Sequence, residues 1–250
     1  MNAAIAGSGS TIQYDEAIME TTPTMTDTLT MEEVCERYKS LYAGAVYDVL
    51  EELGYPNQAL SHELAALAPG MKLAGPAFTV KGTVTAERDT AGRHQRMRMV
   101  CDMASPCIEV RDRGTPYNVA MYGELSATTA RAHGAAGALI DGGTRDSSLL
   151  IRMGFPVFAR YRCPVEAFGR YTLLKTQVPV RIAGELTETV EVNPGDFIFG
   201  EEDGVIVVPK DLIVPVLLQC ERIKGLEDQA RHDFARGDDP VEVFQKYRRF

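Results

Sequence analysis

The segment 121–159 constrains the fold of this chain more than any other, because it predicts two helices and two strands in alternation. Residues 126–133 are rich in Ala and Thr, and the glycine that follows them is typical of a helix end. The short apolar run 136–140 predicts a buried strand. Asp146 is suited to begin a second, short helix, and residues 155–159 are again strand-like. Helices and strands that alternate in this way predict an α/β fold.

The lengths of these elements bring two pairs of polar residues to one edge of the domain. A helix of this size descends about 16 Å, and the strand after it climbs back about 20 Å. Gly123-Glu124 at the start of the helix should therefore lie close to Arg145-Asp146, which follow a glycine-rich turn at 141–143. This edge then combines the unpaired N–H groups of a helix N-terminus with a permanent cation and two carboxylates. Such a set suits an anionic substrate that is bridged to a divalent metal ion.

The rest of the chain predicts further strands between helices, with glycine and proline at the breaks. Thr30 and Glu33 form a capping-box pattern at the start of the first helix. Residues 197–209 predict a hairpin with an acidic turn, followed by a long helix. Residues 1–28 lack periodicity, which indicates either a flexible arm or an arm that packs on a neighbouring subunit. Residues 29–250 are expected to form a single domain with flanking terminal helices.

Composition narrows the class of protein. The chain has 250 residues, of which 45% are hydrophobic, with a formal net charge of −9 and a pI near 5.0, and this acidity argues against nucleic-acid binding. Charges interrupt every apolar run and the N-terminus lacks a basic region before an apolar one, so neither a membrane span nor a secretory signal is expected. An odd number of scattered cysteines without a C-x-x-C pair predicts reduced thiols in a cytoplasmic protein; they are Cys35, Cys101, Cys107, Cys163 and Cys220.

Each polar residue at the predicted edge also has a purely structural interpretation. Asp146 is suited either to bind a metal ion or to cap the helix that follows it. Arg145 would hold an anionic ligand or form a surface salt bridge. Glu124 would serve acid–base chemistry or only favour the helix dipole, and Asp141 would orient Arg145 or form an Asx turn. Three further arginines in the segment 160–170 would meet a polyanionic substrate or remain solvated; they are Arg160, Arg162 and Arg170.

Short motifs in two blocks follow the order and spacing of one known family. They are Gly-Glu-Leu-x-Ala at 123–127, Asp-Gly-x-x-Arg-Asp at 141–146, Phe-Pro-Val-Phe-Ala at 155–159, Val-x-Pro-Gly-Asp at 192–196 and Asp-Gly-Val-x-Val-Val-Pro at 203–209. From about Leu41 onward the chain resembles the class II 4-hydroxy-4-methyl-2-oxoglutarate and 4-carboxy-4-hydroxy-2-oxoadipate aldolases. These are related to the RraA-type ribonuclease E regulators. The family's aldolases place an acidic residue, then twenty others, before Arg-Asp, and Glu124 keeps this spacing.

The resemblance implies a fold, an assembly and a metal ion. The fold would be an α/β/α sandwich similar to swivelling phosphohistidine-type domains, assembled as a homotrimer or homohexamer with active sites between subunits. The metal ion would be Mg²⁺ or Mn²⁺, held directly by Asp146. Arg145 would bind the 2-oxo acid substrate and stabilise its enolate, and Glu124 would act through metal-bound water or in the acid–base set. The backbone N–H groups that would bind the substrate carboxylate belong to Gly123, Glu124, Leu125 and Ser126.

The implied function is a metal-dependent aldolase, a lyase that cleaves a 4-hydroxy-2-oxo acid to pyruvate and a second oxo acid. Oxaloacetate decarboxylation is the expected side activity. Two departures from the family pattern leave alternatives: Leu149 stands where an acidic residue is usual, and Ser105-Pro106-Cys107 replaces a Pro-Gly-Asp turn. One alternative is a non-catalytic RraA-like regulator that binds a ribonuclease or helicase. The other is a related metal–enolate enzyme that acts on a different oxo acid.

Overall fold

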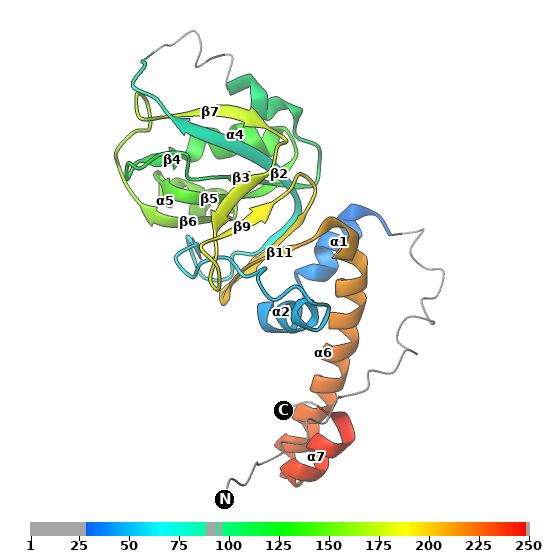
Figure 1. Cartoon of the computed structure of the whole chain (residues 1–250). Coiled ribbons are helices and arrows are strands. Elements are labelled where there is room, and N and C mark those ends of the chain that lie inside the picture. The colour runs from blue at the N-terminus through cyan, green and yellow to red at the C-terminus, as the bar shows by residue number, and fades with distance from the viewer. Residues whose placement is uncertain (1–28, 89–93, 95–96, 249–250) are drawn as a thin grey trace, which may run out of the picture.

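The computed structural model describes residues 29–88, 94 and 97–248, and nine of its eleven strands form a curved, nearly closed, barrel-like sheet (Figure 1). The other two, at 180–183 and 189–192, pair in a separate two-stranded sheet. The strands are β1 (Ala65–Ala66), β2 (Leu73–Val84), β3 (Cys107–Arg111), β4 (Ala120–Tyr122), β5 (Ala135–Thr144), β6 (Val157–Arg162), β7 (Tyr171–Thr176), β8 (Val180–Ala183), β9 (Thr189–Val192), β10 (Phe197–Glu201) and β11 (Gly204–Val208). The main sheet has the order β1-β6-β5-β3-β2-β10-β11, while β4 pairs with β5 and β7 pairs with β2. The expected arm at residues 1–28 lies outside the described residues.

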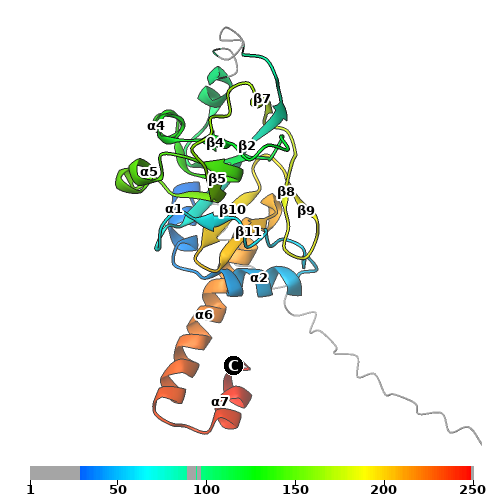
Figure 2. The same ribbon diagram turned by 90° about the vertical axis from the view of Figure 1, so that its left-hand side faces the viewer.

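The helices form two groups around this sheet. They are α1 (Met31–Tyr38), α2 (Ala43–Glu52), α4 (Glu124–Ala132), α5 (Ser147–Met153), α6 (Ile213–Ala235) and α7 (Pro240–Tyr247), with short 3-10 turns η2 (Met99–Asp102) and η3 (Lys210–Leu212). Helices α4 and α5 lie side by side on one flank of the sheet (Figure 2). Helices α1, α2 and the first half of α6 pack together beside β10 and β11, and α6 then extends away from the barrel to α7 (Figure 1).

The described residues form three apolar cores, of which one joins strands β2, β3, β5, β6 and β8 to β11 to each other, while the other two involve the helices. Of these two, one joins the inward faces of α1, α2 and α6 to strands β10 and β11, with Tyr38 packed against Phe197 and Phe199. The other lies between α4 and α5 and the strands β3 to β6, where small residues of α4, such as Ala127 and Ala130, let the helix approach closely. These small side chains explain why the Ala-rich sequence of α4 is compatible with a buried face.

Parallel pairing places four strand ends at one edge. Strand β3 runs parallel to β2 and β5, and β5 runs parallel to β4 and β6. Their carboxyl ends therefore meet, and the last residues are Arg111, Tyr122, Thr144 and Arg162. Ligands of parallel sheets commonly bind beyond the carboxyl ends of the strands. The topology alone thus indicates where a site should lie.

Most predicted elements are confirmed, and one needs correction. The mixed α/β class, the Thr30–Glu33 capping box and the 197–209 hairpin are all present. The likeness to swivelling phosphohistidine-type domains is not confirmed by this arrangement. The predicted turn at 141–143 is wrong, because β5 continues to Thr144. Its glycines serve close packing: a Cβ on Gly142 would lie 2.2 Å from the Met121 side chain, and one on Gly143 would lie 2.5 Å from Tyr161.

In the part of the chain that the structure describes, no helix combines the length and the apolar character that crossing a membrane requires.

Candidate functional site

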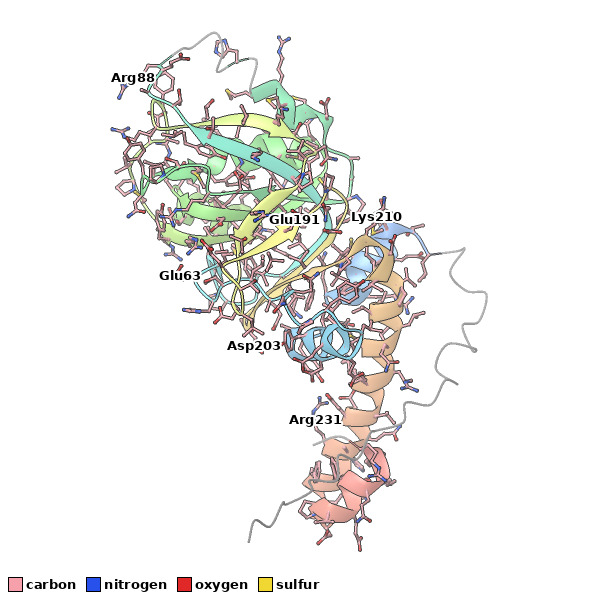
Figure 3. The ribbon with its side chains drawn as sticks, viewed as in Figure 1. Glu63, Arg88, Glu191, Asp203, Lys210 and Arg231 are labelled. Atoms are coloured by element: carbon pink, nitrogen blue, oxygen red, sulfur yellow. The ribbon has the colours of Figure 1, made fainter. Side chains whose placement is uncertain are left out.

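The carboxyl ends of the parallel strands border a cavity of about 270 Å³. Its lining includes Arg111 and Tyr122 at the ends of β3 and β4, and Arg145 and Asp146 beyond the end of β5. Phe168 also lines the cavity, and the guanidinium of Arg88 lies 5.7 Å from the centre of the Phe168 ring. Figure 3 shows Arg88 and the acidic hairpin residue Asp203 on opposite sides of the barrel. The cavity is therefore formed far from the hairpin turn of the same chain.

Asp146 has an unusual backbone conformation that aims its carboxylate at helix α4. Its φ of 57° and ψ of 29° are left-handed, a region that costs most residues free energy although Asp tolerates it better than most. Asp146 stands at the N-cap of α5, yet its side chain makes no capping hydrogen bond there. Instead, its Oδ2 accepts a hydrogen bond of 3.3 Å from the backbone N–H of Glu124. The capping interpretation is therefore wrong for the side chain, and such strain is common at functional sites.

Gly123 provides the space that the Asp146 carboxylate occupies. A Cβ at position 123 would lie 2.7 Å from Asp146 Oδ2, closer than real Cβ atoms approach. Its backbone is extended, with φ −164°, so the requirement is for space and not for a special conformation. Gly123 has no side chain with which to cap α4, so the N–H of Glu124 donates to Asp146, and the N–H groups of Leu125 and Ser126 are oriented as at any helix N-terminus. Gly123, Leu125 and Ser126 all line the cavity.

Arg145 is a partly exposed cation beside this carboxylate. Its Nε lies 3.7 Å from Asp146 Oδ2, and 40% of its side-chain surface is exposed. Its backbone N–H donates to Tyr122 O at 2.9 Å, which fixes the residue to the end of β4. Arg145 and Asp146 also line a second, more open hollow, together with Arg162. Arg145 and Asp146 therefore lie between the cavity and the second hollow and border both. The positive charge of Arg145 is accessible to an anionic ligand.

The backbone N–H of Glu124 takes a more direct part in the site than its side chain does. Its carboxylate accepts a hydrogen bond of 2.8 Å from Thr128 Oγ1, along α4. Glu124 is not among the described residues that line the cavity. Gly123, Glu124, Arg145 and Asp146 nevertheless lie together, as the element lengths predict, and we call these four residues the outer site. Their chemical roles remain predictions.

The three arginines of the segment 160–170 do not gather at the cavity. Arg160 lies on β6, not in a loop, and its guanidinium is hydrogen-bonded to the carboxylates of Asp141 and Glu63. Arg162 is the last residue of β6 and donates to a backbone carbonyl. Arg170 Nη1 donates to Glu166 O at 3.2 Å. Of the two alternatives for these arginines, one shared polyanion site is not what the described residues show, since each arginine bonds to other protein groups, and Asp141 pairs with Arg160 instead of orienting Arg145.

The outer site suits Mg²⁺ or Mn²⁺ more than a metal held by many side chains. Among the described residues, no group of three or more His, Cys, Asp or Glu side chains is close enough to hold a metal ion. Mg²⁺ characteristically keeps several waters and binds to only one or two protein carboxylates. Asp146, with a partly exposed carboxylate beside a cavity, meets that requirement.

The sequence interpretation missed a buried polar cluster, three of whose four members line the cavity. We call it the inner cluster; its members are Glu109, Arg111, Tyr122 and Tyr171. Arg111 Nη2 lies 2.6 Å from Glu109 Oε1, and Arg111 Nη1 donates to Met121 O at 2.8 Å. Burial raises the pKa of the Tyr122 and Tyr171 hydroxyls well above their usual value. The pattern Glu-Val-Arg in β3 was the available signal, because residues two apart in a strand share one face.

Comparisons with known proteins agree with this architecture. The RraA-like family model, described as Aldolase/RraA, matches residues 43–207. A protein of Halalkalibacterium halodurans, named as a candidate 4-hydroxy-4-methyl-2-oxoglutarate aldolase, is 32% identical over 112 residues, which are 45% of this chain and 50% of that protein. In four of the curated relatives that the chain matches, the aligned segment spans 34% to 59% of the relative's length.

Two solved structures show similar folds. A crystal structure described as that of novel cellulases from microbes associated with the gut ecosystem has 32% identity and a TM-score of 0.74, covering 83% of this chain and 90% of that one. RraAS2 of Streptomyces coelicolor, described as an unusual member of the RNase ES inhibitor RraA protein family, has 21% identity and a TM-score of 0.68. That match covers 80% of this chain and 97% of RraAS2, and it supports the fold alone.

Proposed function

Because the chain belongs to the RraA-like family, we propose that it is a metal-dependent lyase that cleaves a 4-hydroxy-2-oxo acid to pyruvate and a second oxo acid. The observation that carries the proposal is the left-handed Asp146, whose carboxylate faces the first N–H of α4 with Arg145 beside it. A cation, a carboxylate and a helix N-terminus are together what an anionic, chelating substrate requires. Relatives that are named as aldolases support a lyase.

Substrate binding follows from these groups. The carboxylate of the 2-oxo acid would accept hydrogen bonds from the N–H groups at the start of α4, where the helix dipole favours negative charge. Arg145 would hold the oxygen of the 2-oxo group. Asp146 would hold Mg²⁺ or Mn²⁺, and when bound the metal ion supplies Lewis-acid polarisation of that group.

Bond cleavage then needs a base and a place for the electron pair. A base removes the proton of the C4 hydroxyl, the C3–C4 bond breaks, and the second product leaves as an oxo acid. The electron pair stays with C3 as the enolate of pyruvate, whose negative oxygen Arg145 stabilises, and a proton added at C3 completes pyruvate. We place Glu124 in this acid–base set. Loss of CO₂ from oxaloacetate leaves the same enolate, so decarboxylation is expected as a side activity.

The experiment measures pyruvate released from 4-hydroxy-4-methyl-2-oxoglutarate and from oxaloacetate, after chelation and after Mg²⁺ or Mn²⁺ is restored. Turnover is expected only with the metal ion. Arg145→Ala and Asp146→Ala should each lower kcat/KM by about 100-fold or more, as for loss of a group that stabilises a developing negative charge. Arg152→Ala, an exposed arginine on α5, is the matched control and should retain turnover.

Three results would contradict the lyase. One is equal turnover of the two variants and the wild type. Another is the absence of turnover together with co-purification of a ribonuclease or helicase, which would identify a regulator. The third is release of reducing sugar from cellulose, as the description of the 32% identical relative would suggest. Light scattering would test the accompanying proposal of a homotrimer or homohexamer.

A further inference from the structure

Strand β4 supports the outer site, although the strand is three residues long. The carbonyl of its last residue, Tyr122, accepts hydrogen bonds from the backbone N–H of Arg145 at 2.9 Å and from Thr144 Oγ1 at 3.3 Å. Helix α4 begins two residues later at Glu124, whose N–H donates to Asp146 Oδ2. The backbone groups that hold Arg145 and Asp146 therefore move with β4.

The backbone pairing of β4 is short and irregular. Ala120 and Tyr122 have partners on β5, at residues 143 and 144, and the register shifts between them. Between these two residues, the carbonyl of Met121 accepts a hydrogen bond of 2.8 Å from Arg111 Nη1. Arg111 is the last residue of β3, which pairs with an earlier part of β5. A side chain from β3 thus holds the middle of β4.

Glu109 orients the guanidinium of Arg111 toward β4. The two residues are two apart in β3 and so share one face of the strand. Arg111 Nε and Nη2 lie 2.7 Å and 2.6 Å from Glu109 Oε1, which leaves Nη1 directed at Met121 O. The guanidinium carbon also lies 4.9 Å from the centre of the Tyr122 ring. Because a guanidinium is planar and rigid, the contact with Glu109 fixes the direction of the bond to β4.

A buried ion pair is an unfavourable way to fill this space unless its geometry is needed. The Arg111 side chain is 8% exposed, and the Glu109 side chain is wholly buried. Removing two charges from water costs free energy, and well-packed apolar residues in their place are often as stabilising or more so. Apolar residues would not, however, provide a directed donor to Met121 O. The ion pair therefore supplies geometry that an apolar pair would not.

Resting on the lyase function above, we propose that Glu109 and Arg111 are positioning residues for the outer site. Arg111, oriented by Glu109, holds the backbone of β4. In turn, β4 holds the backbone of Arg145 and, through the first N–H of α4, the carboxylate of Asp146. The ion pair acts through β4 and not by contact with the reacting atoms. Its loss should displace the cation and the carboxylate, and a displacement of about 1 Å is enough to slow a reaction about 100-fold.

The test replaces both residues together by methionine. In the double variant Glu109→Met/Arg111→Met no buried charge is left unpaired, so its melting temperature should equal or exceed that of the wild type. Pyruvate release with Mg²⁺ should nevertheless fall by about 10- to 100-fold in kcat/KM, because the outer site is misplaced. The loss should appear mainly in kcat, since the ion pair does not bind the substrate.

A second measurement does not depend on the reaction. Hydrogen exchange of the Arg145 backbone N–H, followed by NMR, reports on its bond to Tyr122 O. In the double variant this exchange should be about tenfold faster, as for loss of one hydrogen bond. The backbone N–H of Leu217, in the core around α1, α2 and α6, is the internal control and should exchange as in the wild type.

Two single variants separate positioning from folding. Arg111→Lys keeps a cation beside Glu109 but lacks the planar fork, so it should fold and still show the lower kcat and the faster exchange at Arg145. Leu217→Ala removes a buried side chain from the core around α1, α2 and α6 and should lower the melting temperature. Below that temperature it should keep the wild-type kcat/KM, because β4 is undisturbed.

Wild-type kcat in the folded double variant would overturn the proposal, whether or not exchange at Arg145 changes. So would a raised KM with unchanged exchange, because Arg111 would then bind the substrate directly. If the double variant fails to fold, the same measurements on Arg111→Lys decide. If the wild type releases no pyruvate, the lyase is refuted. Exchange at Arg145 then decides alone whether the ion pair positions the outer site.

Discussion

The two arginines that line the cavity differ in what surrounds them. The Arg111 side chain is 8% exposed and contacts a carboxylate that is wholly buried, whereas 40% of the Arg145 side chain is exposed beside a carboxylate 3.7 Å away. A buried charge requires a partner to offset its lost hydration. An exposed charge is solvated without one, and its ion pair contributes little to stability. Arg111 therefore belongs to the folded structure, while Arg145 is available to a ligand.

The same contrast separates the two carboxylates. Glu109 lies within a strand, in ordinary extended backbone, and its interactions are with the protein. Asp146 adopts a left-handed backbone that directs its carboxylate to the cavity and to the start of α4. The paired, buried carboxylate thus lies on β3, and the carboxylate with the strained backbone lies at the N-cap of α5. Mutations should separate them, with large stability effects at the inner cluster and small ones at the outer site.

Arg111→Met should show the largest effect on stability. It leaves Glu109 buried without its partner, which is expected to lower the free energy of unfolding by about 3–5 kcal/mol. Arg145→Met should lower it by less than about 1 kcal/mol, because its ion pair is exposed. Urea denaturation followed by circular dichroism measures both values. Similar losses for the two variants would remove the distinction between a structural and a ligand-binding arginine.

Asp146→Gly should have a smaller effect on stability, in the opposite direction. Glycine adopts the left-handed backbone without a Cβ penalty, so the free energy of unfolding should rise by up to about 1 kcal/mol. The same change removes the proposed metal ligand and should abolish metal-dependent pyruvate release. Thermal denaturation and the pyruvate assay test the two parts independently. A lower melting temperature would show that the hydrogen bond from the Glu124 N–H to Asp146 stabilises the protein by more than the left-handed backbone costs.

Gly123→Ala should have the smallest effect on stability, a few tenths of a kcal/mol, because its extended backbone accepts any residue. Its Cβ would nevertheless push against Asp146 Oδ2, so kcat/KM should fall by about tenfold or more through misplacement of that carboxylate. Gly225→Ala is the control, since a Cβ there meets no atom within 4 Å and the helical position favours alanine. Gly225→Ala should stabilise the protein without changing kcat/KM. If Gly123→Ala also leaves kcat/KM unchanged, the position of the Asp146 carboxylate does not matter for catalysis.

The outer site was largely predictable because it depends on local lengths. A helix from near Gly123 and a strand that returns to Arg145 bring their ends together whatever else the chain does. The direction of each side chain was not predictable. Glu124 bonds to Thr128 along its own helix, and Asp146 turns away from the helix it precedes. Rotamers and a left-handed backbone depend on neighbours that the local sequence does not specify.

The sequence by itself determined the α/β class, the order of most elements, the family and the location of the outer site, because hydrophobic periodicity, helix caps and motif spacing are local properties. Only the tertiary structure decided the inner cluster and the fate of the glycines in β5. Arg111, with Glu109 paired to it, comes to lie beside Tyr171 through the pairing of β2 with both β3 and β7. Such contacts join residues far apart in the chain, and their energies arise only once the strands have paired.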